Sequence, residues 1–403
     1  MRAAVRIRVV KSWVEISEEQ LLVNYAALDR VAGEDVAVLA VIKADAYGHG
    51  AKVCAPVLAR AGVEWLGVTD AEEGVAVRAS LTAAESQPKI LVMSGLLEED
   101  AETIVRHGLT PVVWTRQQME WLAEAVARLN AEPLAVHLEI DTGMARQGVV
   151  PGEELRELLT WLAAKPSLRL EGVMTHFASS EVADSPLTLK QRERFEQAMA
   201  AVAASGLRPV WVHAGNSSTV DNSAVSERDR GSLVWLRAVA AGAGARAMVR
   251  TGIALYGYCL PVEGGEAMVE PALRPVMAWK TRVIGVREVE AGDTVGYNAI
   301  FTAQRPMRLA LLPVGYADGL RRELSGSDTA SGGWVMIGGQ RAMIVGRVSM
   351  NLTIVDVTKI AGVSVGDEAV LLGDGVTADD HARLAHTIAY EIVCGMRVES
   401  RLV

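Results

Sequence analysis

Eight short β-rich runs alternate with longer helical stretches between residues 36 and 256, and this repeat constrains the fold more than any other feature of the chain. Alternation of this kind indicates parallel strands joined by crossover helices. Eight such units are typical of a (β/α)8 barrel, an α/β fold. A doubly wound open sheet is the alternative, but no Gly-x-Gly-x-x-Gly fingerprint supports it. The predicted strands cover residues 36–43, 65–69, 90–94, 110–115, 134–141, 170–177, 210–216 and 248–256.

The pattern of apolar residues changes after residue 258. Short apolar runs separated by glycine turns fill residues 271–372 and predict a second, mostly antiparallel β domain. We therefore place the barrel in residues 1–262, with the first 12 residues or so packing against the second domain, and the β domain in residues 263–403. The stretch 219–247 is longer than a usual barrel connection and is predicted to be an insertion.

Composition excludes several classes of protein. The chain of 403 residues carries 40 Lys and Arg against 49 Asp and Glu, a net charge of −9, which argues against a nucleic-acid or anionic-membrane surface. Its three cysteines have no metal or redox spacing, which favours a reducing compartment. No uncharged apolar run reaches membrane-spanning length, and the N-terminus has no clean signal-peptide core. These features predict a soluble, cytoplasmic protein with no nucleic-acid or membrane partner and no bound metal.

Lys43 directly follows an apolar run, residues 36–42, that has the character of a strand covered on both faces. In a barrel this lysine would stand at the mouth, where desolvation favours a neutral amine that can form a Schiff base with a carbonyl. Tyr47 lies within reach of whatever Lys43 holds, and Gly48 and Gly50 allow close backbone approach before the next helix. The alternative interpretation is a lysine that simply extends into solvent from a strand end.

Other polar residues cluster at the carboxyl ends of the predicted strands, the face that carries the chemistry of barrel enzymes. The serine and glycine N–H groups after the seventh and eighth strands match the usual phosphate site of this fold. We therefore infer a phosphorylated cofactor beside a reactive lysine. The polar runs are residues 141–146, 175–176, 213–217 and 250–253.

The fifth strand carries a carboxylate, Glu139, on the face opposite Val136 and Leu138. A carboxylate that points into a barrel is costly unless a cation meets it, and Arg146 is its predicted partner. His137 lies on the same face as Glu139. We interpret His137, and likewise His213, as hydrogen-bonded interior histidines rather than catalytic ones.

A set of separated motifs, in order along nearly the whole chain, resembles the alanine racemases, which are pyridoxal-phosphate enzymes with a barrel and a C-terminal β domain. One such motif is weak evidence, but the ordered set is specific. The motifs are Val41-Ile-Lys-Ala-Asp-Ala-Tyr-Gly-His-Gly50, Ile140-Asp-Thr-Gly-Met-Ala-Arg146, Thr175-His-Phe177, His213-Ala-Gly-Asn-Ser217, Arg250-Thr-Gly-Ile-Ala-Leu-Tyr-Gly257, Val295-Gly-Tyr297, Gly315-Tyr-Ala-Asp-Gly319 and Val345-Gly-Arg-Val-Ser-Met350.

The resemblance implies an amino-acid racemase that interconverts L-alanine and D-alanine through a pyridoxal 5'-phosphate aldimine and supplies D-alanine for peptidoglycan. Lys43 would hold the cofactor and serve the D face of Cα. Tyr297 would serve the L face from the other subunit of a head-to-tail homodimer with shared active sites. The other cofactor-binding residues that the resemblance implies are Tyr47, Ser217, Gly252 and Ile253 at the phosphate, Arg250 at the pyridine nitrogen, and His176. The implied substrate contacts are Arg146 and Met350, and the supporting residues are Glu139, Tyr316 and Asn351.

The chemistry fits these residue types. Racemisation needs two opposed bases, and a tyrosine with a pKa of about 10 needs cationic neighbours to act as one. The His176 and Arg250 positions, which contact one another in the family, resemble the relay that would stabilise its phenolate. An arginine at the pyridine nitrogen keeps that nitrogen unprotonated, which should disfavour transamination.

The chain also departs from the family at Glu139, Asn351 and Asn298, and its ending, residues 394–403, lacks the usual proline-containing tail. Glu139 replaces a lysine that is carbamylated in many relatives, so we predict no carbamylation and a direct or water-bridged contact from Glu139 to Arg146. Asn351 replaces the usual aspartate after Met350, and Asn298 replaces a common glycine after Tyr297. A serine or broad-specificity amino-acid racemase therefore remains an alternative. A barrel-type decarboxylase and a non-catalytic cofactor carrier are more remote, because Cys394 matches a decarboxylase motif poorly and a carrier lacks the Tyr297 domain.

Overall fold

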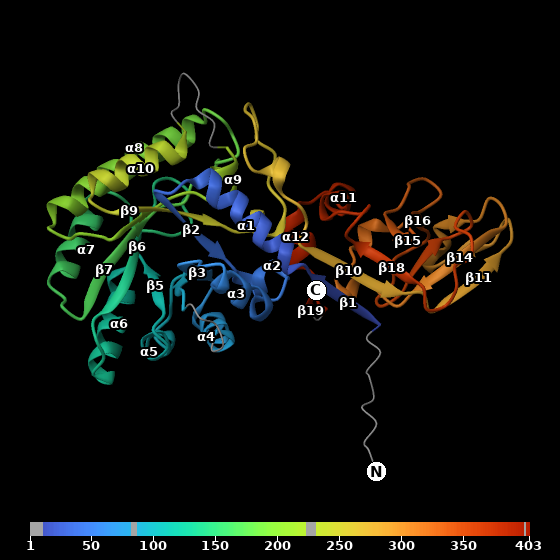
Figure 1. The fold of residues 1–403 in the computed structure, drawn as a ribbon, viewed down its shortest axis with the longest axis horizontal. Helices are drawn as coiled ribbons and strands as arrows, with labels where there is room; N and C mark the ends of the chain where they lie inside the picture. The colour runs from blue at the N-terminus through green and yellow to red at the C-terminus, as the bar shows by residue number, and fades with distance from the viewer. Residues whose placement is uncertain (1–10, 82–86, 223–230, 399) are drawn as a thin grey trace, which may run out of the picture. The chain divides into compact units, whose positions relative to one another are not determined.

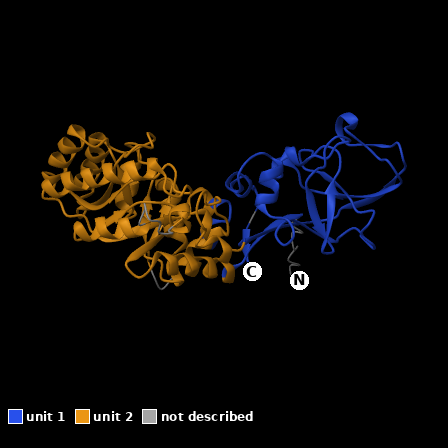
Figure 2. Cartoon of the chain, turned by 90° about the horizontal axis from the view of Figure 1, so that it is seen from above, with its two compact units in different colours: residues 1–18, 47–53, 275–403 blue, residues 19–46, 54–274 orange. Residues whose placement is uncertain are grey.

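The computed structural model describes residues 11–81, 87–222, 231–398 and 400–403, which form two compact units (Figure 2). Unit 1 contains the described residues within 1–18, 47–53 and 275–403, and unit 2 contains those within 19–46 and 54–274. Residues 1–10 of the N-terminal segment expected to pack with the β domain lie outside the described residues. Within the described ranges, no helix combines the length and the apolar character needed to cross a bilayer.

Unit 2 is a closed barrel of eight parallel strands that follow one another in sequence order (Figure 1). The predicted barrel is confirmed, and each predicted strand overlaps one strand of the structure. The strands are apolar and buried because helices cover the outside of the barrel and side chains fill its inside. They are β2 (Val36–Val41), β3 (Trp65–Val68), β4 (Lys89–Val92), β5 (Thr110–Val113), β6 (Leu134–Glu139), β7 (Leu168–Met174), β8 (Trp211–His213) and β9 (Arg246–Thr251).

Several of the helices around the barrel begin at capping residues supplied by the sequence. Thr115 and Gln118 form a capping box at α6, and Ser185 caps α8 just before Pro186. Four leucines at helical spacing form the buried face of α7. The helices are α1 (Glu18–Ala32), α3 (Ala51–Arg60), α4 (Ala71–Ser80), α5 (Asp100–Arg106), α6 (Arg116–Leu129), α7 (Glu153–Ala163), α8 (Pro186–Ala204), α9 (Ser217–Asp221) and α10 (Ser232–Gly242).

The connection between β8 and β9 contains α9 and α10, and α10 packs against both of these strands. This connection is the region that the sequence marks as an insertion, residues 219–247. Residues 223–230 of it lie outside the described residues. The described part therefore provides a barrel helix, α10, in the place where the repeat requires one.

Unit 1 is built on a nine-stranded sheet in the order β11-β14-β17-β16-β15-β18-β10-β1-β19. Only the β1–β19 pair in this sheet is parallel, so the prediction of a mostly antiparallel domain is confirmed. The strands are β1 (Ser12–Ile16), β10 (Met277–Arg282), β11 (Gly285–Val289), β14 (Met307–Leu312), β15 (Trp334–Ile337), β16 (Gln340–Ile344), β17 (Thr353–Asp356), β18 (Glu368–Leu372) and β19 (Ser400–Leu402).

Smaller elements complete unit 1. A two-stranded sheet of β12 (Thr294–Val295) and β13 (Phe301–Thr302) carries the short helix η3 (Tyr297–Ala299) between its strands. Its Val295 packs with Met307, Leu309 and Val345 in a small apolar core that fixes this hairpin on the larger sheet. The helices α11 (Ala378–Leu384) and α12 (Ala389–Cys394) lie between β18 and β19 in the sequence.

Candidate functional site

Lys43 follows β2 at the carboxyl end of the barrel, where the backbone turns in an unusual way. Ala44, Asp45 and Ala46 have φ values of 52°, 52° and 55°, and the N–H of Ala46 donates to the Ile42 carbonyl at 2.8 Å. This is a left-handed turn, a conformation that costs non-glycine residues roughly 1–2 kcal/mol each. Such strain persists only where surrounding contacts enforce it, and it is commonly found at functional sites.

Glu73 on α4 supplies one such contact. Its carboxylate accepts the Asp45 N–H at 3.1 Å and the Thr69 N–H at 2.7 Å. Two N–H groups, one from the left-handed turn and one from the end of β3, therefore share one side chain. We infer that Glu73 holds the backbone that carries Lys43, a role that sequence reasoning missed because the residue lies in an ordinary helical pattern.

Arg250 on β9 is buried, and its guanidinium has three neighbours. It donates to the Thr175 carbonyl at 2.8 Å, to His176 Nδ1 at 3.2 Å and to His213 Nδ1 at 3.2 Å. The structure therefore contains the contact between His176 and Arg250 that the resemblance implied. Because arginine has only donors, both histidine Nδ1 atoms act as acceptors and the proton of each neutral ring resides on Nε2.

Charge at this end of the barrel is dominated by cations. Burial, together with the charges of Arg250, Arg146 and Lys43, lowers the pKa of His176 to about 3. Burial also lowers the pKa of Arg250 to about 10, which Glu139 opposes and Arg146 reinforces. At neutral pH, His176 is therefore uncharged and Arg250 is protonated. A site with this excess of positive charge suits an anionic ligand.

Glu139 ends β6 and is only 2% exposed. Its direct partner is Gln147, whose Nε2 donates to Oε2 at 2.5 Å and to the Met93 carbonyl at 3.0 Å. Burial raises the pKa of Glu139, while this hydrogen bond and the charges of Arg250 and Arg146 oppose the rise. The predicted direct contact with Arg146 is replaced by one with Gln147, because the loop after β6 turns the amide inward and leaves Arg146 exposed. The water-bridged form of the contact stays a prediction.

Ser217, the first residue of α9, joins the loops after β8 and β9. Its Oγ accepts the N–H of Gly252 at 3.0 Å and that of Ala254 at 3.2 Å. Ser217 is 3% exposed and Ile253 is 1% exposed. The structure thus brings together Ser217, Gly252 and Ile253, the three barrel residues that the sequence associated with a phosphate group.

Tyr47, the fourth expected phosphate contact, belongs to unit 1. Its ring centroid lies 6.1 Å from that of Tyr390 on α12, and Gly48 packs so closely against Val393 that a Cβ would lie 2.1 Å from the Val393 carbonyl oxygen. Burial raises the pKa of Tyr47 above its ordinary value, so its hydroxyl remains protonated at neutral pH.

Three further expected residues line a single hollow of about 740 Å³ in unit 1: Tyr297, Tyr316 and Met350. They are 69%, 45% and 57% exposed, which is unusual for large apolar or aromatic side chains. The basic side chains Arg321, Arg322 and Arg397 also line this hollow. Exposed aromatic side chains beside arginines are typical of surfaces that bind a partner or a ligand.

The loops that carry these residues are joined to one another. The N–H of Tyr316 donates to the Ser349 carbonyl at 3.0 Å, and a Cβ on Gly315 would come within 2.1 Å of the same oxygen. Asn351 donates through Nδ2 to Asp318 at 3.3 Å. Asn351 thus supports the hollow, and glycine is required at position 315 because the two loops approach so closely.

Comparison with known proteins identifies the family to which this chain belongs. A model of the N-terminal domain of alanine racemase matches residues 16–260, and one of the C-terminal domain matches residues 276–402. The chain belongs to the alanine racemase family. The alanine racemase of Syntrophobacter fumaroxidans is 36% identical over 390 residues, with 96% of this chain and 95% of the relative covered. That of Symbiobacterium thermophilum is 37% identical, with 96% and 94% covered.

Solved structures of alanine racemases have the same fold. The enzyme from Streptomyces coelicolor superposes with a TM-score of 0.85 at 32% identity, and 98% of each chain is covered. The alanine racemase of Bartonella henselae, with covalently bound pyridoxal phosphate, superposes with a TM-score of 0.79 at 26% identity, covering 98% of this chain and 100% of the other. The alanine racemase family is dependent on pyridoxal phosphate, so the family and cofactor expected from the sequence are confirmed.

Within this family fold, the expected site residues form two groups. Unit 2 brings together Lys43, His176, Arg250, Ser217 and Glu139 at the carboxyl ends of its strands. Unit 1 brings together Tyr297, Tyr316 and Met350. Sequence reasoning missed Gln147 and Glu73. Gln147 lies in the loop after β6 and Glu73 within the helix α4, and neither position carries a distinctive pattern in the sequence.

Proposed function

We propose that this chain is an alanine racemase that interconverts L-alanine and D-alanine with pyridoxal 5'-phosphate. The observation that carries the proposal is the combination of Lys43, buried Arg250 and neutral His176 at one end of a family barrel. Racemisation requires a proton to be removed from one face of Cα and returned to the other, and Lys43 and Tyr297 are the two groups assigned to those faces.

The residues present fit a phosphorylated pyridine aldehyde. Lys43 is a primary amine that can bond to an aldehyde, and the surrounding cations compensate a phosphate dianion. Arg250 is held by three acceptors, so it has a fixed direction in which to meet a ring nitrogen. When bound, the cofactor supplies the electron sink that makes the Cα proton acidic. Ser217, Gly252, Ile253 and Tyr47 are assigned to its phosphate.

The protein's own groups set the direction of proton transfer. His176 accepts from Arg250 at Nδ1, so its Nε2 carries a proton that it can donate to a phenolate. This hydrogen bond, together with the positive charge of Arg250, stabilises a phenolate and so lowers the pKa of a tyrosine. Without them the tyrosine would be a weak base. Tyr297 is the tyrosine assigned to receive it. Arg146 and Met350 are assigned to orient the substrate, and Tyr316 and Asn351 to support them.

We infer further that two copies of the chain form a head-to-tail homodimer in which Tyr297 and Met350 complete the partner's site. The exposure of Tyr297, Tyr316 and Met350 around one hollow supports this inference, since large exposed apolar groups favour burial by a partner. Family membership supports a role in supplying D-alanine for peptidoglycan, and the cysteine content favours a cytoplasmic location.

The test is a racemisation assay of purified protein with pyridoxal phosphate on L-alanine, with L-serine and L-lysine as competing substrates. We expect loss of optical rotation, fastest for alanine. The Tyr297→Phe variant should lose activity by roughly 10²–10⁴-fold while keeping the absorbance of bound pyridoxal phosphate. The Lys43→Ala variant should lose both activity and that absorbance.

The control is Lys165→Ala, which removes a lysine that lies over Trp161 and takes no part in the site. It should retain wild-type turnover. Release of carbon dioxide instead of D-alanine would contradict the racemase proposal. Faster turnover of serine than of alanine would make serine the preferred substrate. An unaffected Tyr297→Phe enzyme would contradict the two-base assignment.

A further inference from the structure

A chain of four buried polar side chains crosses the barrel interior, from Arg250 through His213 and His137 to Glu171. Arg250 Nη1 lies 3.2 Å from His213 Nδ1, and His213 Nε2 lies 2.9 Å from His137 Nδ1. His137 Nε2 then lies 3.8 Å from Glu171 Oε2. The two histidines are 0% exposed, Glu171 is 2% exposed and Arg250 is 4% exposed. Because β7 lies between β6 and β8 in the sheet, the contact between the two imidazoles passes over β7, where Gly172 has no side chain to block it.

The hydrogen bonds that link these four side chains can run in only one direction. Arginine cannot accept, so His213 accepts at Nδ1 and carries its proton on Nε2. That proton is donated to His137 Nδ1, which places the proton of His137 on Nε2, the atom that faces Glu171. Burial lowers the pKa of each imidazole, and the nearby Arg250 charge lowers it further. At His137 the neighbouring Glu171 raises the pKa but does not reverse the net lowering, so both rings are neutral. Every donor therefore points towards the carboxylate.

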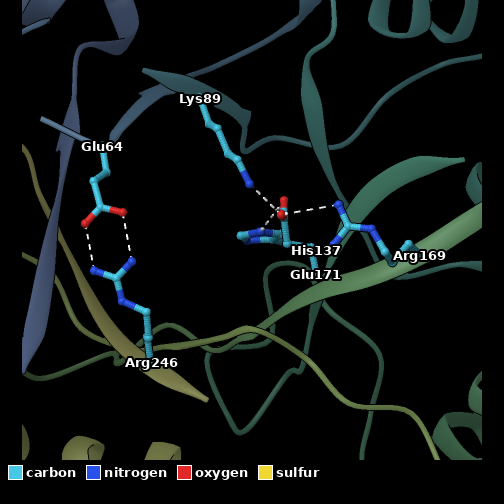
Figure 3. A network of polar contacts seen from close by, with 6 residues as sticks. All are labelled: Glu64, Lys89, His137, Arg169, Glu171 and Arg246. Carbon is cyan, nitrogen blue, oxygen red and sulfur yellow. Dashed lines mark hydrogen bonds and ion pairs between the residues drawn. The ribbon is translucent and has the colours of Figure 1, made fainter. Parts of the chain in front are cut away.

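Glu171 stays ionised because its other oxygen meets two cations at the amino-terminal end of the barrel. Its Oε1 lies 2.6 Å from Lys89 Nζ and 3.4 Å from Arg169 Nη2 (Figure 3). Burial raises the pKa of Glu171, but His137 and Lys89 outweigh this effect and lower it to about 2. Across the described residues, Oε2 of Glu171 and Nε2 of His137 have no hydrogen-bond partner. The 3.8 Å between them is longer than a hydrogen bond, so the carboxylate acts on the imidazole electrostatically.

Packing fixes the orientation of the His137 ring. A Cβ on Gly172 would come within 2.6 Å of His137 Nδ1, so the ring lies directly against that backbone. On another side the ring centroid lies 5.0 Å from that of Trp65. The imidazole can therefore present Nδ1 to His213 and Nε2 to Glu171 with little freedom to rotate.

We propose that Glu171 and His137 are positioning residues that hold the Arg250 guanidinium through His213. The carboxylate orders the tautomers of both imidazoles, and the ordered imidazoles keep an acceptor, His213 Nδ1, facing Arg250. Without that acceptor Arg250 loses one of the three contacts that fix its direction. This inference rests on the proposed function, because Arg250 is assigned to the ring nitrogen of pyridoxal phosphate.

The test compares Glu171→Gln with Glu64→Gln in the holoenzyme. Glu64 is a matched control because it also pairs with an arginine, Arg246, at 2.7 and 2.9 Å near the amino ends of the strands, but has no contact with the four-residue chain (Figure 3). We expect Glu171→Gln to weaken the binding of pyridoxal phosphate, measured by equilibrium dialysis, and to lower kcat, each by roughly tenfold, as loss of an outer-sphere partner commonly does. Glu64→Gln should change neither value by more than about twofold.

A second measurement does not depend on turnover. Nitrogen-15 NMR of histidine-labelled wild-type protein should show His137, His213 and His176 as neutral Nε2–H tautomers. An Nδ1–H tautomer at His213 would overturn the proposal. If Glu171→Gln does not fold, His137→Gln provides the same test, because it interrupts the chain at the next position and leaves Glu171 paired with Lys89.

Equal losses in Glu171→Gln and Glu64→Gln would reduce Glu171 to a stabilising role, and wild-type cofactor binding in folded Glu171→Gln would also overturn the inference. Failure of the proposed function looks different, since the wild-type protein itself would then not racemise alanine. The two ideas can therefore fail separately.

Discussion

The two ends of the barrel carry charged residues in different ways. At the amino-terminal end several charges are paired directly with an opposite charge, as in Lys89 with Glu171 and Arg246 with Glu64. At the carboxyl end Lys43, Arg146 and Arg250 share their surroundings with one buried carboxylate, Glu139. The first arrangement neutralises these charges within the protein. The second groups three cations with the carboxylates of Glu139 and Asp141, and a site of this kind suits an anionic ligand.

The backbone differs between the two ends as well. The strands begin in regular geometry, whereas β2 leads directly into the left-handed turn of Ala44, Asp45 and Ala46. Strain and excess charge both reduce stability, and both occur where Lys43 is presented. A single closed barrel thus combines a stable end with a reactive one, which is the usual division in this architecture.

The largest predicted effect is that of acid on the stability of the fold, through the buried histidines. The folded pKa values of His137, His176 and His213 lie below the unfolded value near 6.5, so the unfolded chain binds more protons as pH falls. Their stabilising contribution is present above pH 6.5, and below it we expect the free energy of unfolding to fall by about 1.4 kcal/mol per pH unit for each histidine. Denaturant titrations at pH 7, 6 and 5 measure this slope.

Glu171 should respond only in stronger acid. Its folded pKa of about 2 lies below its ordinary value, so its contribution is present above about pH 4.5 and is lost as pH falls towards 2. The Glu171→Gln variant should therefore reduce the second phase of the titration and keep the first. Part of the second phase should persist, because burial of Glu15 is outweighed by its hydrogen bonds to Arg401 and Lys280, which lower its pKa to about 2 as well. A stability profile that is flat between pH 7 and 5 would contradict the assignment of neutral buried histidines.

The second prediction concerns removal of the Glu139 carboxylate from the carboxyl end of the barrel. Glu139→Gln should weaken cofactor or substrate binding by roughly tenfold, because Arg250 and Arg146 lose a nearby negative charge that helps to hold them in place. Steady-state kinetics and dialysis of pyridoxal phosphate measure this effect. Wild-type kinetics in Glu139→Gln would contradict a role for this carboxylate, and mass spectrometry of the wild-type protein should find no carbamylated lysine near the site.

The smallest effect concerns backbone strain. Ala44→Gly should stabilise the protein by about 0.5–1 kcal/mol, since relief of the left-handed conformation outweighs the entropic cost of glycine. The matched control is Ala203→Gly in the right-handed helix α8, which should destabilise by about the same amount. Thermal unfolding of both variants measures the two changes in stability. If both substitutions change the stability in the same direction, strain at position 44 is excluded.

Much of the site could be read from the sequence because its residues lie next to strand ends. Lys43, His176, Ser217 and Arg250 each sit beside an apolar run, and a barrel brings such positions to one face. Glu171 gave no such signal. It lies within β7 and matters through side chains from other strands, His137 and Lys89, so only the closed sheet reveals its neighbours.

The sequence by itself determined the eight strand-helix units, the separate β domain and the family, because periodicity and ordered motifs are properties of neighbouring residues along the chain. The tertiary structure decided which polar groups meet. It paired Glu139 with Gln147 rather than directly with Arg146, joined His137 to His213 over the intervening strand β7, and bent the chain after Lys43 into a left-handed turn. These outcomes depend on distances between residues far apart in the chain, and local patterns do not encode those distances.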